Sequence, residues 1–122
     1  MKDQKKTLVL GASLKETRYS NKAIIALRKA QVPTCAIGLR AGNVADVTIE
    51  TEPQNFEGIN TVTLYINPKR QPAYYDYILD LNPKRVLFNP GTENPDFYRL
   101  LRDNKIEVEV ACTLVLLATN QY

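Results

Sequence analysis

The chain has 122 residues, of which 44% are hydrophobic and 24% are charged, and its formal net charge is +3. This size and composition are typical of one soluble globular domain covering residues 1–122. Every apolar run is far shorter than the roughly 20 residues that span a bilayer, and the polar start MKDQKK lacks the pattern of a signal peptide. We therefore expect a cytoplasmic protein with no membrane partner. The mild charge suits an anionic small ligand but lacks the basic stripe that a nucleic-acid partner requires.

Missing residue types narrow the chemistry further. The sequence contains no histidine, which excludes His-based triads, phosphohistidine chemistry and the commonest zinc ligand. The two cysteines, Cys35 and Cys112, are far apart and form no CxxC pair. We therefore expect two reduced structural thiols and no metal site.

Apolar segments alternate with amphipathic segments along the whole chain. Short β-branched or apolar runs predict strands at residues 7–10, 34–37, 60–66, 85–88 and 106–110, with a possible short strand at 47–49. Periodic spacing and N-terminal signals predict helices at about residues 21–31, from Pro72 up to Asn82-Pro83, and from Pro95 onward. Strands that alternate with helices of about ten residues predict a mostly parallel sheet with right-handed crossovers.

Three local features concern a helix start, an edge strand and the last apolar segment. Ser20 is a candidate N-cap for the first helix. The alternating run 106–110 would turn Glu107 and Glu109 toward water, which predicts an edge strand. The last apolar run, residues 113–118, fits either a strand or a short helix.

Ligands of an open parallel sheet bind beyond the carboxyl ends of its strands, near the point where the strand order reverses. The first such loop follows Gly11, which allows a sharp turn, and its small residues let a pyrophosphate approach the main-chain amides. Hydroxyls, cations and the start of the first helix would add hydrogen bonds and positive charge. The candidate ligand residues of this loop are Gly11, Ala12, Ser13, Arg18, Ser20 and Lys22.

The loop after the second strand narrows the choice of nucleotide. An NAD site would place Asp or Glu there for the ribose hydroxyls, whereas this chain has Gly38, Leu39 and Arg40. A guanidinium favours a ribose that carries a phosphate. NADP and coenzyme A both fit, and a solvated loop arginine is the remaining alternative.

The stretch VLGASLKETRYSNKAI resembles the small single-domain CoA-binding proteins, which share a Rossmann-like fold with the CoA-binding domain of succinyl-CoA synthetase α subunits. The resemblance covers nearly the whole chain and implies a three-layer α/β/α fold with a mostly parallel sheet of about five strands. It implies that the first loop holds the CoA diphosphate and that Arg40 contacts the adenosine 3′-phosphate. It also implies further ligand contacts in the later loops, at Asn67, Pro68, Asn89 and Gly91.

The expected function is non-catalytic binding of coenzyme A or acyl-CoA. The chain has no P-loop, and Cys112, which matches a family cysteine, has no neighbouring base in the sequence, so we expect no catalytic residue. An NADP-binding reductase-like domain and a Rossmann-like interaction protein that has lost its ligand remain the alternatives. Strand 106–110 and the apolar tail offer a possible surface for a homodimer or another protein partner.

Overall fold

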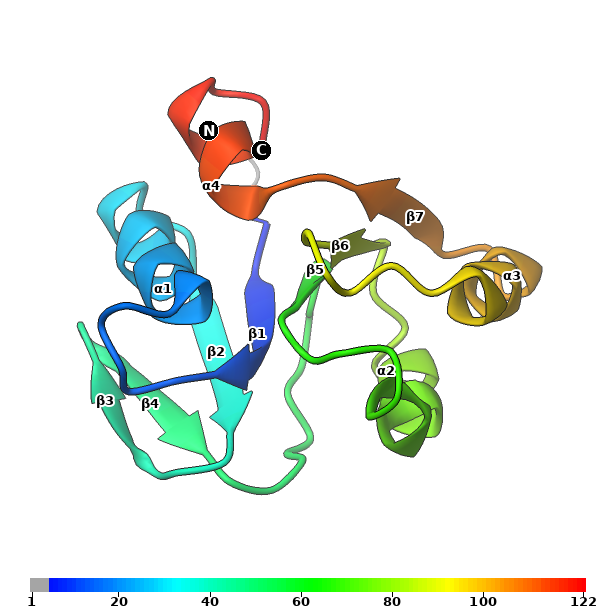
Figure 1. Ribbon diagram of the computed structural model, residues 1–122, viewed down its shortest axis with the longest axis horizontal. Helices are drawn as coiled ribbons and strands as arrows, with labels where there is room; N and C mark the ends of the chain where they lie inside the picture. Colours follow the sequence, from blue (N-terminus) through cyan, green and yellow to red (C-terminus); the bar gives the residue numbers. More distant parts are fainter. Residues whose placement is uncertain (1–4) are drawn as a thin grey trace.

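The computed structural model describes residues 5–122 and forms one sheet with helices on both faces (Figure 1). The strands are β1 (Thr7–Ala12), β2 (Thr34–Gly38), β3 (Gly42–Val44), β4 (Val47–Glu50), β5 (Thr61–Leu64), β6 (Arg85–Phe88) and β7 (Glu107–Val110). The helices are α1 (Tyr19–Lys29), the 3-10 helix η1 (Gln71–Tyr74), α2 (Tyr75–Leu81), α3 (Pro95–Asp103) and α4 (Thr113–Ala118).

The order of the strands indicates where a ligand cleft would lie in this sheet. Across the described residues the order is β3-β4-β2-β1-β5-β6-β7, and every neighbouring pair is parallel except β3 with β4. The chain moves from β1 to β2 on one side and later returns to β5 on the other side. The strand order therefore reverses at β1, which is where a doubly wound sheet leaves a crevice.

The predicted α/β fold with a mostly parallel sheet is confirmed, although the sheet has seven strands where about five were expected. The additional strands, β3 and β4, form a short antiparallel hairpin beside β2. β4 coincides with the possible strand at 47–49. β3 has only three residues, GNV, and so carries too little pattern to be predicted.

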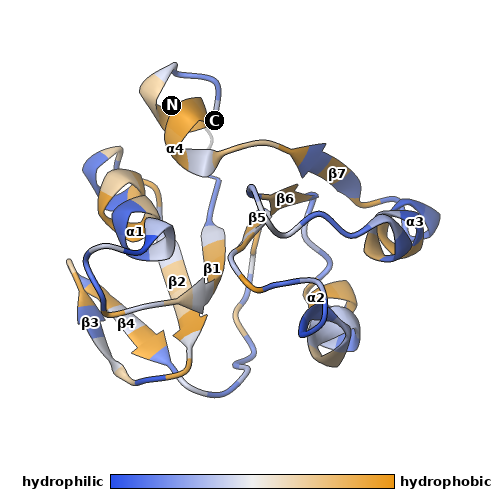
Figure 2. Ribbon diagram, viewed as in Figure 1, coloured by the Kyte–Doolittle hydropathy of each residue, from blue (hydrophilic) through white to orange (hydrophobic). Residues whose placement is uncertain are grey.

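Two apolar clusters, one on each face of the sheet, produce the three layers. Alternate residues of β1 point to opposite faces, so Leu8 and Leu10 join one cluster and Val9 joins the other. The first cluster packs against α2 and α3, and the second packs against α1 and α4. In Figure 2 the central strands are mainly hydrophobic, while α1, α2 and α3 carry both hydrophobic and hydrophilic residues.

The helix boundaries show that the predicted N-cap of the first helix is wrong and that the last apolar run is a helix. Helix α1 begins at Tyr19, its N-cap is Arg18 and no side chain caps it, so the prediction that Ser20 is the N-cap is wrong. Ser20 instead lies buried in the first turn. The run 113–118 is helix α4. Within residues 5–122 no helix has the length and apolar character needed to cross a membrane.

Strand β7 lies at an edge of the sheet, as predicted, but its two glutamates differ. Glu107 is exposed. Glu109 accepts a hydrogen bond from Arg85 Nη1 at 2.9 Å and its side chain is only 29% exposed, so the prediction that both face water is wrong for Glu109. The alternation itself is kept, and the exposure of Glu109 is reduced beside its ionic partner on the neighbouring strand.

Candidate functional site

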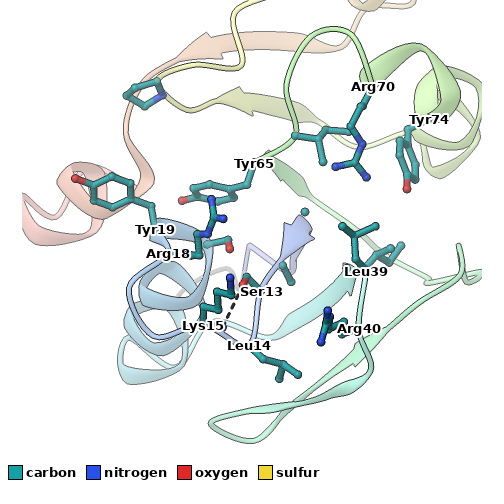
Figure 3. A pocket seen from close by; sticks show the side chains of 17 residues that line it. Ser13, Leu14, Lys15, Arg18, Tyr19, Leu39, Arg40, Tyr65, Arg70 and Tyr74 are labelled. Carbon is teal, nitrogen blue, oxygen red and sulfur yellow. Dashed lines mark hydrogen bonds between the residues drawn. The ribbon is translucent and has the colours of Figure 1, made fainter.

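A cleft of about 730 Å³ opens where β1, β2 and β5 end, at the point where the strand order reverses (Figure 3). Eight of the residues predicted from the sequence line it: Gly11, Ala12, Ser13, Arg18, Ser20, Gly38, Leu39 and Arg40. The other lining residues are Leu14, Lys15, Tyr19, Ile37, Tyr65, Ile66, Arg70, Tyr74 and Pro90. A volume of this size is within the range of sites for small ligands and cofactors.

Two glycines allow the backbone at the bottom of the cleft to pack closely. Gly11 has a φ of 100°, and a Cβ there would lie 2.9 Å from both the Ile66 Cγ2 and the Tyr65 carbonyl carbon. A Cβ at Gly38 would overlap the carbonyl oxygen of Ala12. Any larger residue at either position would push apart the strand ends that border the cleft.

The loop between β1 and α1 is held by its own hydrogen bonds. Asn21 Nδ2 donates to the Ser13 carbonyl oxygen at 3.0 Å, and the Lys15 amide donates to Ser13 Oγ at 3.1 Å, a bond drawn in Figure 3. The loop therefore delivers the first turn of α1 to the cleft, where both Tyr19 and Ser20 line the wall. A helix N-terminus has unpaired N–H groups and a positive dipole end, which favour an anion.

Four cations line the cleft: Lys15, Arg18, Arg40 and Arg70. Among the described residues, none that lines the cleft carries a carboxylate. Among residues 5–122 the three ion pairs involve other cations, so these four have no acidic partner. Unpaired cations around a concave surface raise the local positive potential and attract anionic ligands.

Tyr65 forms part of the cleft wall next to the end of β5. Burial raises the pKa of its phenol to about 12, and hydrogen bonding to Thr113 and Thr63 opposes that shift. The hydroxyl is therefore neutral near pH 7 and adds no negative charge to the cleft. The sequence analysis missed this residue because it predicted a strand up to residue 66, whereas β5 ends at Leu64.

Five predicted ligand residues lie outside the lining of the cleft: Lys22, Asn67, Pro68, Asn89 and Gly91. Lys22 is exposed in the first turns of α1. The Asn67 side-chain oxygen accepts from the Arg70 amide at 3.1 Å, and Pro68 lies in the same turn. The Gly91 amide donates to Glu93 Oε1 at 2.9 Å.

Asn89 is 3% exposed, and its amide group is occupied by the protein itself. Its Nδ2 donates to Thr63 Oγ1 at 2.6 Å and to the Leu64 carbonyl oxygen at 2.9 Å. Its Oδ1 accepts from the Thr113 amide at 2.9 Å. Asn89 therefore ties β5 and the end of β6 to the start of α4, and a buried amide with these partners has a structural role.

The two cysteines also lie away from the cleft lining. Both are half-buried and free. Burial is the main cause that raises the pKa of the Cys35 thiol, which lowers its reactivity. Within residues 5–122 no three His, Cys, Asp or Glu side chains gather in a way that could hold a metal ion.

The fold and the cleft together define a Rossmann-like domain with a cation-lined cleft at its topological switch point. The model of the CoA binding domain family matches residues 5–118, and the chain belongs to that family. This membership supports CoA binding in general. A search of curated proteins found no match.

Solved structures share the fold over nearly the full length. The crystal structure of an uncharacterized protein is 44% identical, with a TM-score of 0.95 over 99% of this chain and 100% of that one. The structure of cell-free ID.343 from Thermus thermophilus is 18% identical, with a TM-score of 0.85 over 98% of this chain and 91% of that one. A hypothetical protein from Pyrococcus horikoshii is 18% identical, with a TM-score of 0.84 over 97% of this chain and 84% of that one.

Proposed function

We propose that the protein binds coenzyme A or an acyl-CoA in this cleft and does not transform it chemically. The observation that carries the proposal is the set of four cations around the cleft of a CoA-binding family member, with no carboxylate from the described part of the chain beside them. The diphosphate would lie against the Gly11-Ala12-Ser13 turn and the start of α1. The 3′-phosphate of the adenosine would lie near Arg40, at the end of β2.

The charges of ligand and cleft are of similar size. The single diphosphate bridge contributes about two negative charges and the 3′-phosphate about two more, so CoA carries about four near neutral pH. Lys15 and Arg18 flank the diphosphate loop, while Arg40 and Arg70 come from the loops that follow β2 and β5. Both parts of the ligand would therefore meet positive charge.

The absence of catalysis is supported by what surrounds the possible nucleophiles. The hydroxyl groups that line the cleft belong to Ser13, Tyr19, Ser20, Tyr65 and Tyr74. Activation of a hydroxyl requires an adjacent general base; the sequence has no histidine, and no carboxylate from residues 5–122 lines the cleft. A module of this kind would carry, sense or present its ligand. Any protein partner, including a second copy of the chain, stays a prediction.

Thermal unfolding with CoA, acetyl-CoA, NADPH and NAD at equal concentrations tests the proposal. A ligand present at 100 times its dissociation constant stabilises the folded state by about 2.7 kcal/mol. For a domain of this size that corresponds to a rise in Tm of about 10 °C. We expect CoA or acetyl-CoA to raise the Tm most. A shift with NADPH alone would favour the reductase-like alternative, which no comparison supports, and no shift at all would favour a fold that has lost its ligand.

Prolonged incubation of acetyl-CoA with the protein tests the non-catalytic part separately. We expect the free thiol concentration to rise no faster than in buffer. Release of thiol at a rate proportional to protein concentration would show that the cleft hydrolyses the thioester, and binding without catalysis would then be the wrong description.

A further inference from the structure

Asn21 is a buried polar residue whose presence the stability of the fold does not explain. It lies in the first turn of α1, is only 2% exposed and does not line the cleft. Its Oδ1 is buried without a hydrogen-bond partner, and it is the one such side-chain atom among residues 5–122. A buried polar atom without a partner lowers the stability of the folded state. Asparagine at this position therefore requires a reason other than stability.

The helix that contains Asn21 does not supply that reason. Asparagine is a weaker helix former than leucine and favours a helix mainly by capping its first N–H groups. No side chain caps α1. Asn21 Nδ2 donates instead to the Ser13 carbonyl oxygen at 3.0 Å, eight residues earlier and in the loop that follows β1. The amide group of Asn21 therefore serves the loop and not the helix.

Two cavities border this loop. One is the cleft, and the other is a smaller cavity of about 170 Å³ between the loop, α1 and the β3–β4 hairpin. Leu14 lines both cavities, and a Cβ at Gly42 would lie 2.7 Å from Leu14 Cδ2, so the loop contacts the hairpin through this side chain. Close packing on all sides, which fixes most interior segments, is therefore incomplete around the loop. Its position depends on its hydrogen bonds.

The bond from Asn21 differs from the other bonds of the loop. The Lys15 amide donates to Ser13 Oγ, and the Arg18 amide donates to the Lys15 carbonyl oxygen at 3.0 Å. Both bonds join residues within the loop, so they shape it without attaching it to another element. The bond from Asn21 Nδ2 attaches the start of the loop to α1.

The same bond sets the direction of the next amide. In a trans peptide the carbonyl group of one residue and the N–H group of the next point in opposite directions. The Ser13 carbonyl oxygen is directed to Asn21, which lies outside the cleft lining, so the Leu14 N–H group is directed away from Asn21. No hydrogen bond from that amide to another of residues 5–122 is present. The Leu14 amide is therefore available to an anion in the cleft.

We propose that Asn21 is a positioning residue for the ligand's diphosphate: it holds the Ser13 carbonyl on the α1 side and so keeps the Leu14 amide directed to the cleft. The inference rests on the proposed function, which places the diphosphate of CoA against this loop. It makes Asn21 a residue that lowers stability and raises affinity, so the two properties should change in opposite directions when it is replaced.

Asn21→Leu tests the inference, because leucine has a similar size and removes the unpartnered oxygen together with the donor. We expect the urea midpoint of unfolding to equal or exceed that of the wild type. Calorimetry should show CoA binding about tenfold more weakly, the effect of losing one hydrogen bond that orders the site. Dephospho-CoA should lose the same factor, because it contains the same diphosphate.

Asn104→Leu is the matched control. Asn104 Nδ2 also donates to a backbone carbonyl oxygen, that of Leu100 at 2.9 Å, but it does so at the end of α3 and outside the cleft lining. CoA affinity of this variant should stay within about twofold of wild type. Loss of an asparagine bond to the backbone would then weaken CoA only where that bond holds the loop.

Nuclear magnetic resonance of the wild-type protein gives a second readout. In protein labelled with nitrogen-15, the side-chain amide signals of Asn21 should move in a saturable way as CoA is added, because their acceptor belongs to the loop that meets the ligand. The side-chain amide signals of Asn104 should stay in place. A role of Asn21 in stability alone would leave both sets of signals unmoved.

CoA affinity within about twofold of wild type in Asn21→Leu would overturn the inference. A fall in the urea midpoint together with the affinity would also overturn it, because Asn21 would then be an ordinary structural residue. If Asn21→Leu does not fold, asparagine does not lower stability here, and the affinity of Asn21→Ala decides the positioning role. If the wild-type protein binds no CoA, the proposed function itself fails, which is a separately recognisable outcome.

Discussion

Arginine residues have opposite environments at the two ends of the strands. Near the amino ends of the strands, Arg85 is 6% exposed and each nitrogen of its guanidinium donates a hydrogen bond. It donates to Thr61 Oγ1 and Glu109 Oε1, both at 2.9 Å, and its Cζ lies 4.4 Å from the ring centroid of Tyr122. At the carboxyl ends, the cleft arginines are exposed and have no acidic partner within residues 5–122.

The difference separates the cations that stabilise the fold from those that are available for a ligand. A buried charge without a partner costs several kcal/mol, so Arg85 is retained only with its full set of acceptors. An exposed cation has no such requirement, and its affinity for an anion is kept when no carboxylate competes for it. The cleft cations thus cost little in the free protein and remain available to bind phosphate.

Replacing Arg85 should produce the largest loss of stability. In Arg85→Met the Glu109 carboxylate and the Thr61 hydroxyl lose their donor, and we expect the free energy of unfolding to fall by about 2–3 kcal/mol. The loss is below that of a fully buried pair because Glu109 can still reach water. Urea denaturation measures it. Arg99→Met, which removes an exposed pair at 3.8 Å, should cost well under about 1 kcal/mol.

The same variant checks the separation of roles. CoA affinity of folded Arg85→Met should stay within about twofold of wild type, because Arg85 lies at the amino ends of the strands and the cleft lies at their carboxyl ends. If Arg85→Met lost CoA affinity together with stability, the two ends of the strands would be coupled. The division into stabilising and ligand-binding arginines would then be wrong.

Gly11 and Gly91 offer a matched pair for the cleft itself. Both have positive φ values, 100° and 94°, but a Cβ would meet close neighbours only at Gly11. Gly11→Ala should lose about 2 kcal/mol of stability and at least tenfold in CoA affinity, because backbone strain and displacement of β5 add together. Gly91→Ala should lose about 1 kcal/mol and bind CoA normally. Equal affinity losses would mean that close packing at Gly11 does not shape the site.

Arg40 tests whether an unpaired cleft cation recognises one phosphate. Arg40→Gln should weaken CoA by about tenfold or more, as expected for the loss of a charged hydrogen bond, and leave dephospho-CoA almost unchanged. The difference should shrink at high salt, since screening acts over about 8 Å at physiological ionic strength. Unfolding by urea should be unaffected. A similar loss for both ligands would place the contact of Arg40 elsewhere on CoA.

The sequence predicted the sheet and the location of the cleft at the carboxyl ends of the strands, because both depend on repeated, local signals. Alternating apolar and amphipathic segments specify βαβ units, and parallel strands bring their carboxyl ends together whatever the loops contain. Gly11 and Gly38 were identified for the same reason, since each comes directly after an apolar run that predicts a strand, and the structure places both in the last two residues of β1 and β2.

Side-chain direction within the loops could not be predicted in this way. Asn89 follows a strand and has the polar amide of a ligand residue, yet Thr63 and Thr113 from distant segments occupy it. Glu109 shares a face with Glu107, but the Arg85 guanidinium on the neighbouring strand pairs with it and covers part of it. Long-range partners decide these cases, and one sequence does not reveal them.

Replacing Lys15 or Lys22 tests whether side-chain direction decides which cation binds the ligand, and we expect the smallest effects on CoA affinity here. Both are exposed lysines near the start of α1, but only Lys15 lines the cleft, because the irregular loop held by Asn21 turns it there. Lys15→Gln should weaken CoA about two- to fivefold, the contribution of an exposed, screened cation to a phosphate contact. Lys22→Gln should change the affinity less than twofold. If calorimetry gave Lys22 the larger effect, the ligand would lie over α1 rather than in the cleft, and the assignment of the diphosphate to the Gly11-Ala12-Ser13 turn would be wrong.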